Sequence, residues 1–357
     1  MEGLVMNRNF WRGKRVFLTG HTGFKGGWLA LWLSDMGAKV FGYALRHQHE
    51  NGIYSVAEVS GLIDMETIGD VRDKETLQNS LNKAQPELII HLAAQPLVRK
   101  SYLNPIDTFS VNTMGLINLL EVAKTTETVK AIVNVTTDKC YENNQTVIPH
   151  VENEKLGGKD PYSASKACAE IISACYRSSY FDFQEIALAT ARAGNVIGGG
   201  DEAEDRLIPD FFRSIRLREP IILRNPSATR PWQHVLEPLS GYLKLSELLL
   251  KDGKNFSEAF NFGPIPKEIS SVENIVKLLI DLYRDGSWKL DKRAQPFETQ
   301  TLALDSSKAK DKLGWTPRWN INEALSKTVD WHKDLCNGCD MAQTTIKQII
   351  DYENSLK

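Results

Sequence analysis

The sequence lacks several features that would indicate whole classes of protein. No apolar run approaches the roughly 20 residues that a membrane-spanning helix needs, and residues 1–7 show no basic stretch leading into an apolar core. We therefore expect no membrane segment and no signal peptide. The formal net charge is only -2 and no basic stripe is present, so we expect no nucleic-acid partner.

Cysteine is also scarce. The five cysteines are an odd number and are unevenly spread, which indicates free thiols and a cytoplasmic protein. Cys336 and Cys339 have the spacing of a metal-ligand pair, and His332 is the one nearby candidate to join them. Because no second pair follows, we predict no metal site and keep zinc or redox use as the minor alternative.

What the sequence does contain, in its first half, is an alternation of apolar strand-like runs and helix-like segments. Nearly unbroken apolar runs are typical of strands that are buried on both faces, as in a parallel sheet covered by helices. The predicted strands are residues 16–19, 39–43, 88–92, 131–135 and 186–190, and the predicted helices are 113–124 and 162–180. This rhythm predicts an α/β fold with a Rossmann-like, doubly wound parallel sheet.

The alternation weakens after Gly198, where prolines become frequent and one further helix is predicted at 272–283. We interpret residues 1–196 as a dinucleotide-binding domain to which the 230–265 region also contributes strands. Residues 197–357 are then mainly a smaller, discontinuous substrate-binding lobe at the carboxyl end of the chain.

A glycine-rich loop follows the first predicted strand and opens the first helix. Glycines three apart allow a tight turn and a close backbone approach, so that amide groups at the helix N-terminus can face a pyrophosphate. A glycine pattern alone is weak evidence, but a downstream Tyr-x-x-x-Lys strengthens it. The residues predicted to bind a dinucleotide are Gly20, Gly23, Phe24, Lys25, Gly26, Asp70, Val71, Leu92, Ala93, Ala94, Tyr162 and Lys166.

One expected feature of the cofactor site is missing. The second strand ends at Ala44-Leu45-Arg46 without a carboxylate for a ribose 2′-hydroxyl, and Arg46 could instead meet a 2′-phosphate. The residues alone therefore leave NAD and NADP open. Asp70 is read either as an acceptor for the adenine amino group or as a surface carboxylate, and Asn112 as a bridge between buried backbone groups.

Proton chemistry is indicated by two short strings. Tyr162 and Lys166 lie four residues apart and so share one helix face, where the ammonium is expected to favour the ionised phenol and make it a usable base. Thr137, at the end of a predicted strand, is expected to hold the same reacting oxygen. Asp138 and Lys139 add a second acid and a second base, which is more than a simple alcohol oxidation requires.

Together these pieces resemble the extended short-chain dehydrogenase/reductase family over roughly residues 13–330. Within it, the third-position lysine of the string Thr137-Asp138-Lys139 is similar to that of the sugar-nucleotide 4,6-dehydratases that act on CDP-glucose. The strings that carry the resemblance are residues 20–26, Thr137-Asp138-Lys139, Tyr162 with Lys166, Arg192-x-x-Asn195 and residues 224–238.

The resemblance implies a lyase that holds NAD tightly and regenerates it in each cycle. It also implies a homodimer built on a four-helix interface, or a dimer of dimers, and a place in deoxysugar synthesis for lipopolysaccharide O-antigen. We expect Tyr162 to take the proton of the hexose 4-hydroxyl while hydride leaves C4, Lys139 to remove the C5 proton, and Asp138 to protonate the departing 6-hydroxyl. The alternatives are a Lys139 that only orients water or substrate, and a structural Asp138–Lys139 pair.

The diphosphate of a nucleotide sugar needs cationic partners. The predicted substrate-binding residues are Asn195, Arg206, Arg224, Arg230 and His234. Arg206 and Arg230 are favoured because they lie in strings that match the family, whereas Arg216 and Arg218 are expected to be solvated on a helix. His234 is as consistent with a satisfied structural histidine as with a pocket residue.

Three rival functions stay open from the sequence. A sugar-nucleotide 4-epimerase needs the Tyr162–Lys166 pair but not Asp138 and Lys139, and a dehydratase for GDP-mannose or a UDP-sugar differs only in its substrate. A non-catalytic nucleotide sensor is opposed by the intact Thr137, Tyr162 and Lys166. The choice of cytosine as the base rests on the resemblance alone.

Overall fold

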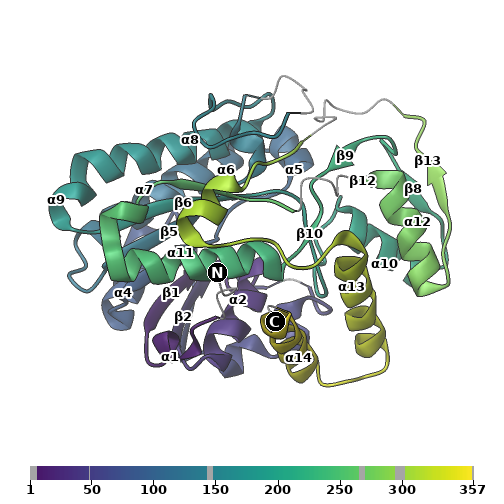
Figure 1. Cartoon of the computed structure of the whole chain (residues 1–357), viewed down its shortest axis with the longest axis horizontal. Helices are drawn as coiled ribbons and strands as arrows, with labels where there is room; N and C mark the ends of the chain where they lie inside the picture. Colours follow the sequence, from purple (N-terminus) through teal and green to yellow (C-terminus); the bar gives the residue numbers. More distant parts are fainter. Residues whose placement is uncertain (1–5, 48, 143–147, 265–269, 294–301, 356–357) are drawn as a thin grey trace.

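A computed structural model describes residues 6–47, 49–142, 148–264, 270–293 and 302–355. Its centre is a seven-stranded sheet in which all neighbouring strands are parallel, in the order β11-β6-β5-β4-β1-β2-β3 (Figure 1). The strands are β1 (Arg15–Thr19), β2 (Lys39–Ala44), β3 (Met65–Ile68), β4 (Leu88–His91), β5 (Ala131–Val135), β6 (Ala187–Ala193) and β11 (Ala259–Phe262). All five predicted strands belong to this sheet, and the predicted α/β fold is confirmed.

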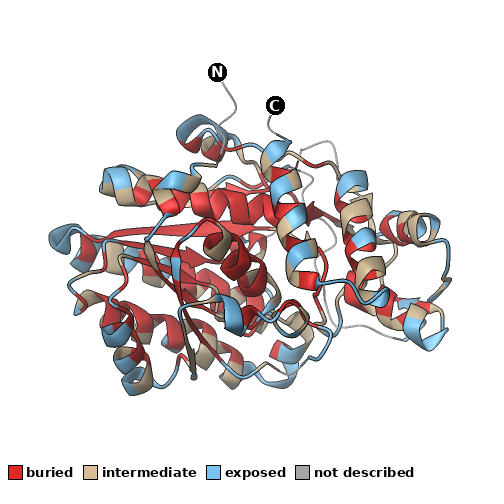
Figure 2. Ribbon diagram, turned by 90° about the horizontal axis from the view of Figure 1, so that it is seen from below, coloured by how far each residue is buried: buried red, intermediate tan, exposed pale blue. Residues whose placement is uncertain are grey.

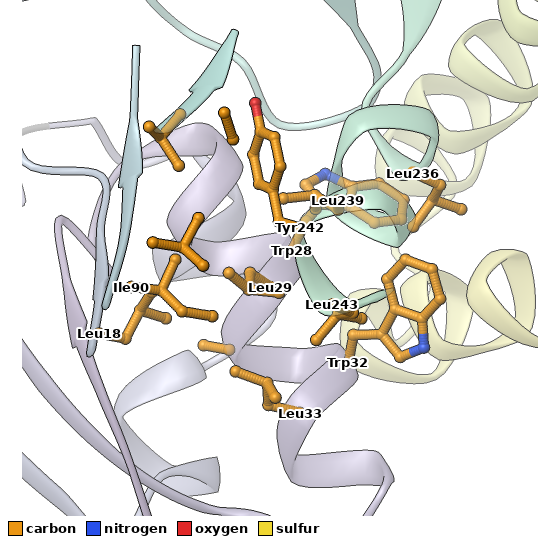
Figure 3. Packing of buried hydrophobic residues seen from close by; sticks show 14 of the residues in the cluster. Leu18, Trp28, Leu29, Trp32, Leu33, Ile90, Leu236, Leu239, Tyr242 and Leu243 are labelled. Atoms are coloured by element: carbon orange, nitrogen blue, oxygen red, sulfur yellow. The ribbon is translucent and has the colours of Figure 1, made fainter. Parts of the chain in front are cut away.

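Helices cover both faces of the sheet, as strands with two buried faces require. On one face, α2 (Phe24–Asp35) and α11 (Leu236–Asp252) pack against the strands. Figure 3 shows their contact, in which Trp28 of α2 lies beside Leu239 of α11, and Leu29 of α2 lies between them and Leu18 and Ile90 of the sheet. On the other face lie α4 (Lys74–Ala84), α7 (Gly115–Lys124) and α8 (Pro161–Tyr176).

The burial pattern follows this layered arrangement. Figure 2 shows the central strands of the sheet largely buried, while the surrounding helices alternate buried and exposed faces. The predicted helix at 113–124 corresponds to a wide turn at Ser110–Met114 followed by α7, and the predicted helix at 162–180 to α8 and its continuation at Arg177–Phe181. Within the described residues, every helix is too short or too polar to cross a membrane.

A smaller group of elements packs around an apolar cluster of its own, at the right of Figure 1. It comprises α10 (Leu207–Leu217), β8 (Ile221–Leu223), α12 (Val272–Tyr283), β13 (Trp288–Leu290) and α13 (Ile321–Cys336). Phe211, Ile275 and Leu325 are buried at its centre. The bounds of α12 are those predicted from the sequence.

The end of the chain returns to the sheet domain. Helix α14 (Met341–Asn354) packs against α2, where Glu353 accepts a hydrogen bond of 2.7 Å from Trp32 Nε1. Strand β11, which extends the sheet, lies inside the 230–265 region that was expected to contribute to it. Residues after 197 therefore pack in both parts of the molecule, and the domain boundary at 196 stays an interpretation.

The remaining elements are short. They are α1 (Arg8–Trp11), α3 (Ile53–Val56), α5 (Val98–Leu103), α6 (Pro105–Phe109), α9 (Asp182–Gln184), β7 (Val196–Ile197), β9 (Thr229–Arg230), β10 (Gln233–His234) and β12 (Ser270–Ser271). Strand β10 pairs with β7 and β12 pairs with β9. Val196 and Ile197 of β7 and Arg230 of β9 line the cavity described below.

Candidate active site

A cavity of about 860 Å³ lies at the carboxyl ends of the central strands and is lined by residues of the sheet domain and of the smaller lobe. This is where open α/β sheets bind ligands, beside the point at which the strand order reverses, here between β1 and β4. Every predicted cofactor-binding residue lines it, as do Thr137, Lys139 and four of the five predicted substrate-binding residues. His234 does not line the cavity, and neither does Asp138.

The glycine loop between β1 and α2 has the shape that a dinucleotide requires. Gly20 has φ +78°, and a Cβ there would lie 2.8 Å from the backbone nitrogen of Ala93. A Cβ on Gly26 would lie 2.0 Å from the carbonyl oxygen of Gly20. Gly23 begins α2, and no side chain caps that helix end. The uncapped amides and the close backbone packing fit the pyrophosphate of a dinucleotide.

Residues at the carboxyl ends of β2 and β3 line another part of the cavity. Ala44 and Leu45 line it, whereas Arg46, the residue that could have met a 2′-phosphate, does not. Asp70 lines the cavity, and Arg72 holds its carboxylate with hydrogen bonds from Nε (3.0 Å) and Nη2 (2.6 Å). These bonds lower the pKa of Asp70, so this carboxylate is an ionised acceptor at neutral pH.

The segment after β5 brings three predicted catalytic residues together in one tight turn. Thr137 Oγ1 accepts from the backbone nitrogen of Lys139 at 3.3 Å and donates to Asp138 Oδ1 at 3.0 Å. Lys139 Nζ lies 3.2 Å from Asp138 Oδ1 and 3.5 Å from Asn195 Oδ1. The other carboxylate oxygen, Asp138 Oδ2, is buried without a hydrogen-bond partner among the described residues. The site therefore holds an acid, a base and an amide within reach of one another.

Tyr162 and Lys166 both line the cavity from α8, as their four-residue spacing predicted. Burial raises the pKa of Tyr162 to about 12, although a hydrogen bond with Thr137 acts the other way. Lys166 Nζ donates to the carbonyl oxygen of Val135 at 3.0 Å, and burial lowers its pKa to about 8. The expected lowering of the phenol pKa is therefore wrong for the protein alone, because the loss of water around the phenol outweighs the hydrogen bond with Thr137 and the charge of Arg206.

Positive charge accumulates in the cavity. Lys25 is partly buried near Arg206 and Lys166, and desolvation together with these charges lowers its pKa to about 7. Arg206 Nη1 is paired with Asp201 at 3.0 Å, and Arg230 Nη1 donates to the carbonyl oxygen of Thr229 at 2.9 Å. Such a set of cations favours an anionic ligand such as a diphosphate.

Several predicted residues lie away from the cavity. His234 is fully buried between the rings of Trp28 and Trp319, with centroid distances of 5.6 and 5.0 Å, which is the structural arrangement left open above. Arg216 and Arg218 do not line the cavity, and Arg216 is exposed and pairs with Glu202 at 3.1 Å. Both lie outside the predicted site, as expected for solvated arginines.

Two further predictions concern Asn112 and the pair of Cys336 and Cys339. Asn112 accepts from the backbone nitrogen of Gln95 at 2.8 Å and donates to its carbonyl oxygen at 3.1 Å, so its expected bridging role is confirmed. Cys336 and Cys339 are exposed free thiols, and His332 stacks on the ring of Phe212. In the described part of the chain, no three His, Cys, Asp or Glu side chains gather as metal ligands would.

The sequence did not predict the buried ion pair between Glu170 and Arg192 that lies beside this site. Glu170 lies on α8 four residues after Lys166, and it is buried in an ion pair with Arg192 of β6 at 2.7 Å. The four-residue spacing after Lys166 was the available signal, because it places Tyr162, Lys166 and Glu170 on one helix face. Its partner could not be read from the chain, since Arg192 lies on a different element.

The chain was compared with known proteins. The sequence profile of the family described as GDP-mannose 4,6 dehydratase matches residues 17–328. The chain is 49% identical over 354 residues to the CDP-glucose 4,6-dehydratase of Salmonella typhimurium, and the match covers 98% of each chain. It is 25% identical to the dTDP-glucose 4,6-dehydratase of Xanthomonas campestris, over 94% of this chain and 95% of that one.

Solved structures with the same fold are more distant in sequence. DesIV, a dTDP-glucose 4,6-dehydratase from Streptomyces venezuelae solved with NAD and TYD bound, has a TM-score of 0.78 at 22% identity and covers 92% of this chain and 99% of that chain. The epimerase Mth375 from Methanothermobacter thermautotrophicus has a TM-score of 0.80 at 23% identity and covers 93% of this chain and 96% of that chain. At this level of identity the likeness establishes the fold.

Proposed function

The chain belongs to the family described as GDP-mannose 4,6 dehydratase, and from this premise we propose that it is a lyase that converts CDP-D-glucose to CDP-4-keto-6-deoxy-D-glucose and water. The observation that carries the proposal is the 49% identity, over 98% of both chains, to an enzyme named for this reaction. The chemistry of the cavity supports it, because Asp138 and Lys139 lie beside the oxidation residues.

The cofactor is NAD. The glycine loop, the uncapped start of α2 and the absence of Arg46 from the cavity lining all fit it, and DesIV was solved with NAD bound. When bound, NAD takes a hydride from C4 of the sugar and returns it to C6, and its positive ring favours the ionised phenol. The residues that would hold it are those of the glycine loop, Asp70, Val71, Leu92, Ala93, Ala94, Tyr162 and Lys166.

The first half of the reaction is oxidation at C4. Tyr162 takes the proton of the 4-hydroxyl, and the Thr137 hydroxyl holds the same oxygen in place. Lys166 contributes positive charge beside the phenol. Because the pKa of Tyr162 is raised to about 12 in the protein, chiefly by burial, this step depends on the cationic surroundings of the phenol.

The second half is loss of water. The C4 ketone acidifies the proton on C5, and Lys139 removes it. Asp138 gives a proton to the 6-hydroxyl, which departs as water and leaves a double bond between C5 and C6. Hydride then arrives at C6 while Lys139 returns its proton to C5, and the proton held by Tyr162 passes through solvent to restore Asp138. The sugar thus loses one water with no net oxidation, and the contact of Lys139 with Asp138 and Asn195 supports a role for this acid and this base in the same step.

The test is incubation with NAD and a panel of CDP-glucose, UDP-glucose, dTDP-glucose and GDP-mannose. We expect CDP-glucose to yield a product lighter by one water, with the ultraviolet band that 4-keto-6-deoxy sugars develop in alkali. A product of unchanged mass would indicate a 4-epimerase, and preferential turnover of another nucleotide sugar would overturn the choice of base.

A variant of the glycine loop tests the cofactor site directly. In Gly26→Ala the new Cβ overlaps the carbonyl oxygen of Gly20, so the loop must shift. Overpacking of this kind costs about 1–3 kcal/mol, and we expect the Kd for NAD, measured by calorimetry, to rise roughly 5- to 150-fold. Gly61→Ala is the control, because a Cβ there meets nothing within 4 Å. Equal affinity in the two variants would contradict the site.

We further propose the homodimer that the sequence led us to expect. α6 packs against α8, and large apolar side chains near them are exposed: Leu103 80%, Ile106 85%, Met114 50% and Ile171 57%. Such a patch is typical of a surface that another subunit covers. A cytoplasmic location and a role in O-antigen synthesis stay predictions, and the five free cysteines are in keeping with a reducing compartment.

A charge placed in this patch tests the dimer. We expect Ile106→Asp to elute as a monomer in size-exclusion chromatography with light scattering, because a carboxylate would be desolvated at the centre of the interface. Leu217→Asp, on α10 of the smaller lobe and 67% exposed, should leave the mass unchanged. A monomeric parent protein, or an unaltered Ile106→Asp dimer, would exclude this interface.

A further inference from the structure

A buried ion pair lies next to the residues proposed to catalyse the reaction, and no step of the mechanism uses it. Glu170 Oε2 and Arg192 Nη2 are 2.7 Å apart, and the two residues are 4% and 3% exposed. A buried pair is weak evidence for stability, because the cost of desolvating two charges offsets most of their attraction. The presence of the Glu170–Arg192 pair is therefore better explained by its position in the molecule than by a contribution to stability.

Glu170 joins three elements. Its Oε1 accepts a hydrogen bond from the hydroxyl of Thr136, at the end of β5, and its Oε2 accepts one of 2.7 Å from the hydroxyl of Thr190 on β6. Glu170 itself belongs to α8, one turn after Lys166. The carboxylate thus holds the start of the catalytic segment against the helix that carries Tyr162 and Lys166.

Arg192 holds the other end of the same segment. Its Nη1 donates to the hydroxyl of Tyr141 at 2.8 Å, and the guanidinium lies 4.9 Å from the centroid of the Tyr141 ring. The Tyr141 hydroxyl in turn donates to Asn261 Oδ1 of β11 at 2.7 Å, and its ring stacks on His150 at 4.8 Å. Tyr141 is therefore fixed by its hydroxyl, by its ring and by a buried charge.

Thr136 and Tyr141 are the residues that immediately flank Thr137, Asp138, Lys139 and Cys140. We infer that the Glu170–Arg192 pair, acting through Thr136 and Tyr141, is a positioning device that holds the acid and the base of water elimination against the oxidation site. The inference rests on the proposed function, and it assigns Tyr141 and Glu170 as positioning residues rather than catalytic ones.

The two halves of the reaction should depend on this device unequally. Tyr162 and Lys166 are held by α8 itself, whereas Asp138 and Lys139 lie in the short turn that Tyr141 follows. Loss of the Tyr141 hydroxyl frees the end of that turn but leaves α8 unaltered. Water elimination should therefore slow more than oxidation at C4, because a displacement of about 1 Å costs up to roughly a hundredfold in rate.

The experiment is a single-turnover comparison of the holoenzyme with Tyr141→Phe, using CDP-glucose. The absorbance of reduced nicotinamide reports C4 oxidation, and the alkaline ultraviolet band of the product reports water loss. We expect elimination to slow about 10- to 100-fold while C4 oxidation changes less than about threefold, so that reduced cofactor accumulates. Phenylalanine keeps the stacking on His150, so the variant should retain the fold.

Tyr176→Phe is the matched control, because the hydroxyl of Tyr176, on α8, also donates a hydrogen bond to a side chain of another element, Glu121 of α7 at 2.9 Å, but away from the cavity. It should alter neither rate. If Tyr141→Phe leaves the ratio of the two rates unchanged, or slows both steps equally, the inference is wrong. If the parent protein eliminates no water from CDP-glucose at all, the proposed function fails instead, and the two failures are thereby distinguished.

Glu170→Gln gives a second, electrostatic readout. Lys166 is faced by Glu170 on its own helix, by Cys140 of the turn, by Lys25 of α2 and by His91 of β4. Of these, the Glu170 charge opposes the lowering of the Lys166 pKa by burial, so its removal should move the alkaline limb of the pH–rate profile for C4 oxidation to lower pH. Tyr141→Phe should leave that limb in place, and an unmoved limb in Glu170→Gln would contradict the role of the carboxylate.

Discussion

Tyr162→Phe is expected to abolish both chemical steps, with a loss of about 10²- to 10⁴-fold in turnover. The variant removes one hydroxyl and keeps a ring that is 8% exposed and packed in the cavity wall. Without a base at the 4-hydroxyl, no C4 ketone forms, and the C5 proton is then too weakly acidic for Lys139 to remove. The measurement is steady-state product formation together with the absorbance of reduced nicotinamide, and neither signal should appear.

A distant tyrosine provides the control for this prediction. Tyr283 packs against Phe211 and Phe212 in the smaller lobe, with ring centroids 6.3 and 5.9 Å apart, and Tyr283→Phe should turn over normally. Retained CDP-glucose turnover in Tyr162→Phe would exclude the phenol as the base. Loss of NAD affinity in the same variant, measured by calorimetry, would instead indicate that the residue mainly binds cofactor.

Lys139→Met has the second largest expected effect, and it should divide the reaction in two. Methionine preserves the length of the side chain but cannot take up the C5 proton, so water loss should fall about 10²- to 10⁴-fold. Oxidation at C4 should persist, because Thr137, Tyr162 and Lys166 are unaltered. Stoichiometric reduced nicotinamide without the alkaline product band is the expected result, read in single-turnover mixtures with CDP-glucose.

The outcome also separates the roles that were left open for Lys139. Lys155, an exposed residue of the same region, supplies the control variant Lys155→Met, which should match the parent protein. Unchanged water loss in Lys139→Met would remove the lysine from the mechanism. An equal loss of oxidation and elimination would assign Lys139 to orienting the substrate, as the alternative reading has it.

Local spacing predicted much of the fold and of the site. The unbroken apolar runs predicted the strands because a strand with two buried faces needs them on both sides. The glycines at 20, 23 and 26 predicted the cofactor loop because the requirement is local to the backbone, as the blocked Cβ positions at Gly20 and Gly26 show. Tyr162 and Lys166 were found because a helix brings residues four apart onto one face.

Predictions that depended on the three-dimensional surroundings of a side chain were less accurate. The phenol of Tyr162 was expected to be acidic, yet burial raises its pKa to about 12, because the degree of burial is set by the packing of the whole domain. His234 lies in a string that matches the family, yet its ring is enclosed by Trp28 of α2 and by Trp319 of the loop before α13. A matching sequence motif indicates the part of the fold in which a residue lies, but it does not indicate the direction in which the side chain points.

The sequence by itself determined the layered α/β architecture and the position of the dinucleotide loop, and it predicted the proton-transferring groups, since each depends on residues within a few positions of one another. Only the tertiary structure decided that Thr136 and Tyr141 share one buried ion pair, that Asp138 Oδ2 is left without a partner in the described chain, and that Lys25 lies beside Arg206 and Lys166. These facts join residues far apart in the chain, and their electrostatics follow from burial, which exists only after the chain has folded.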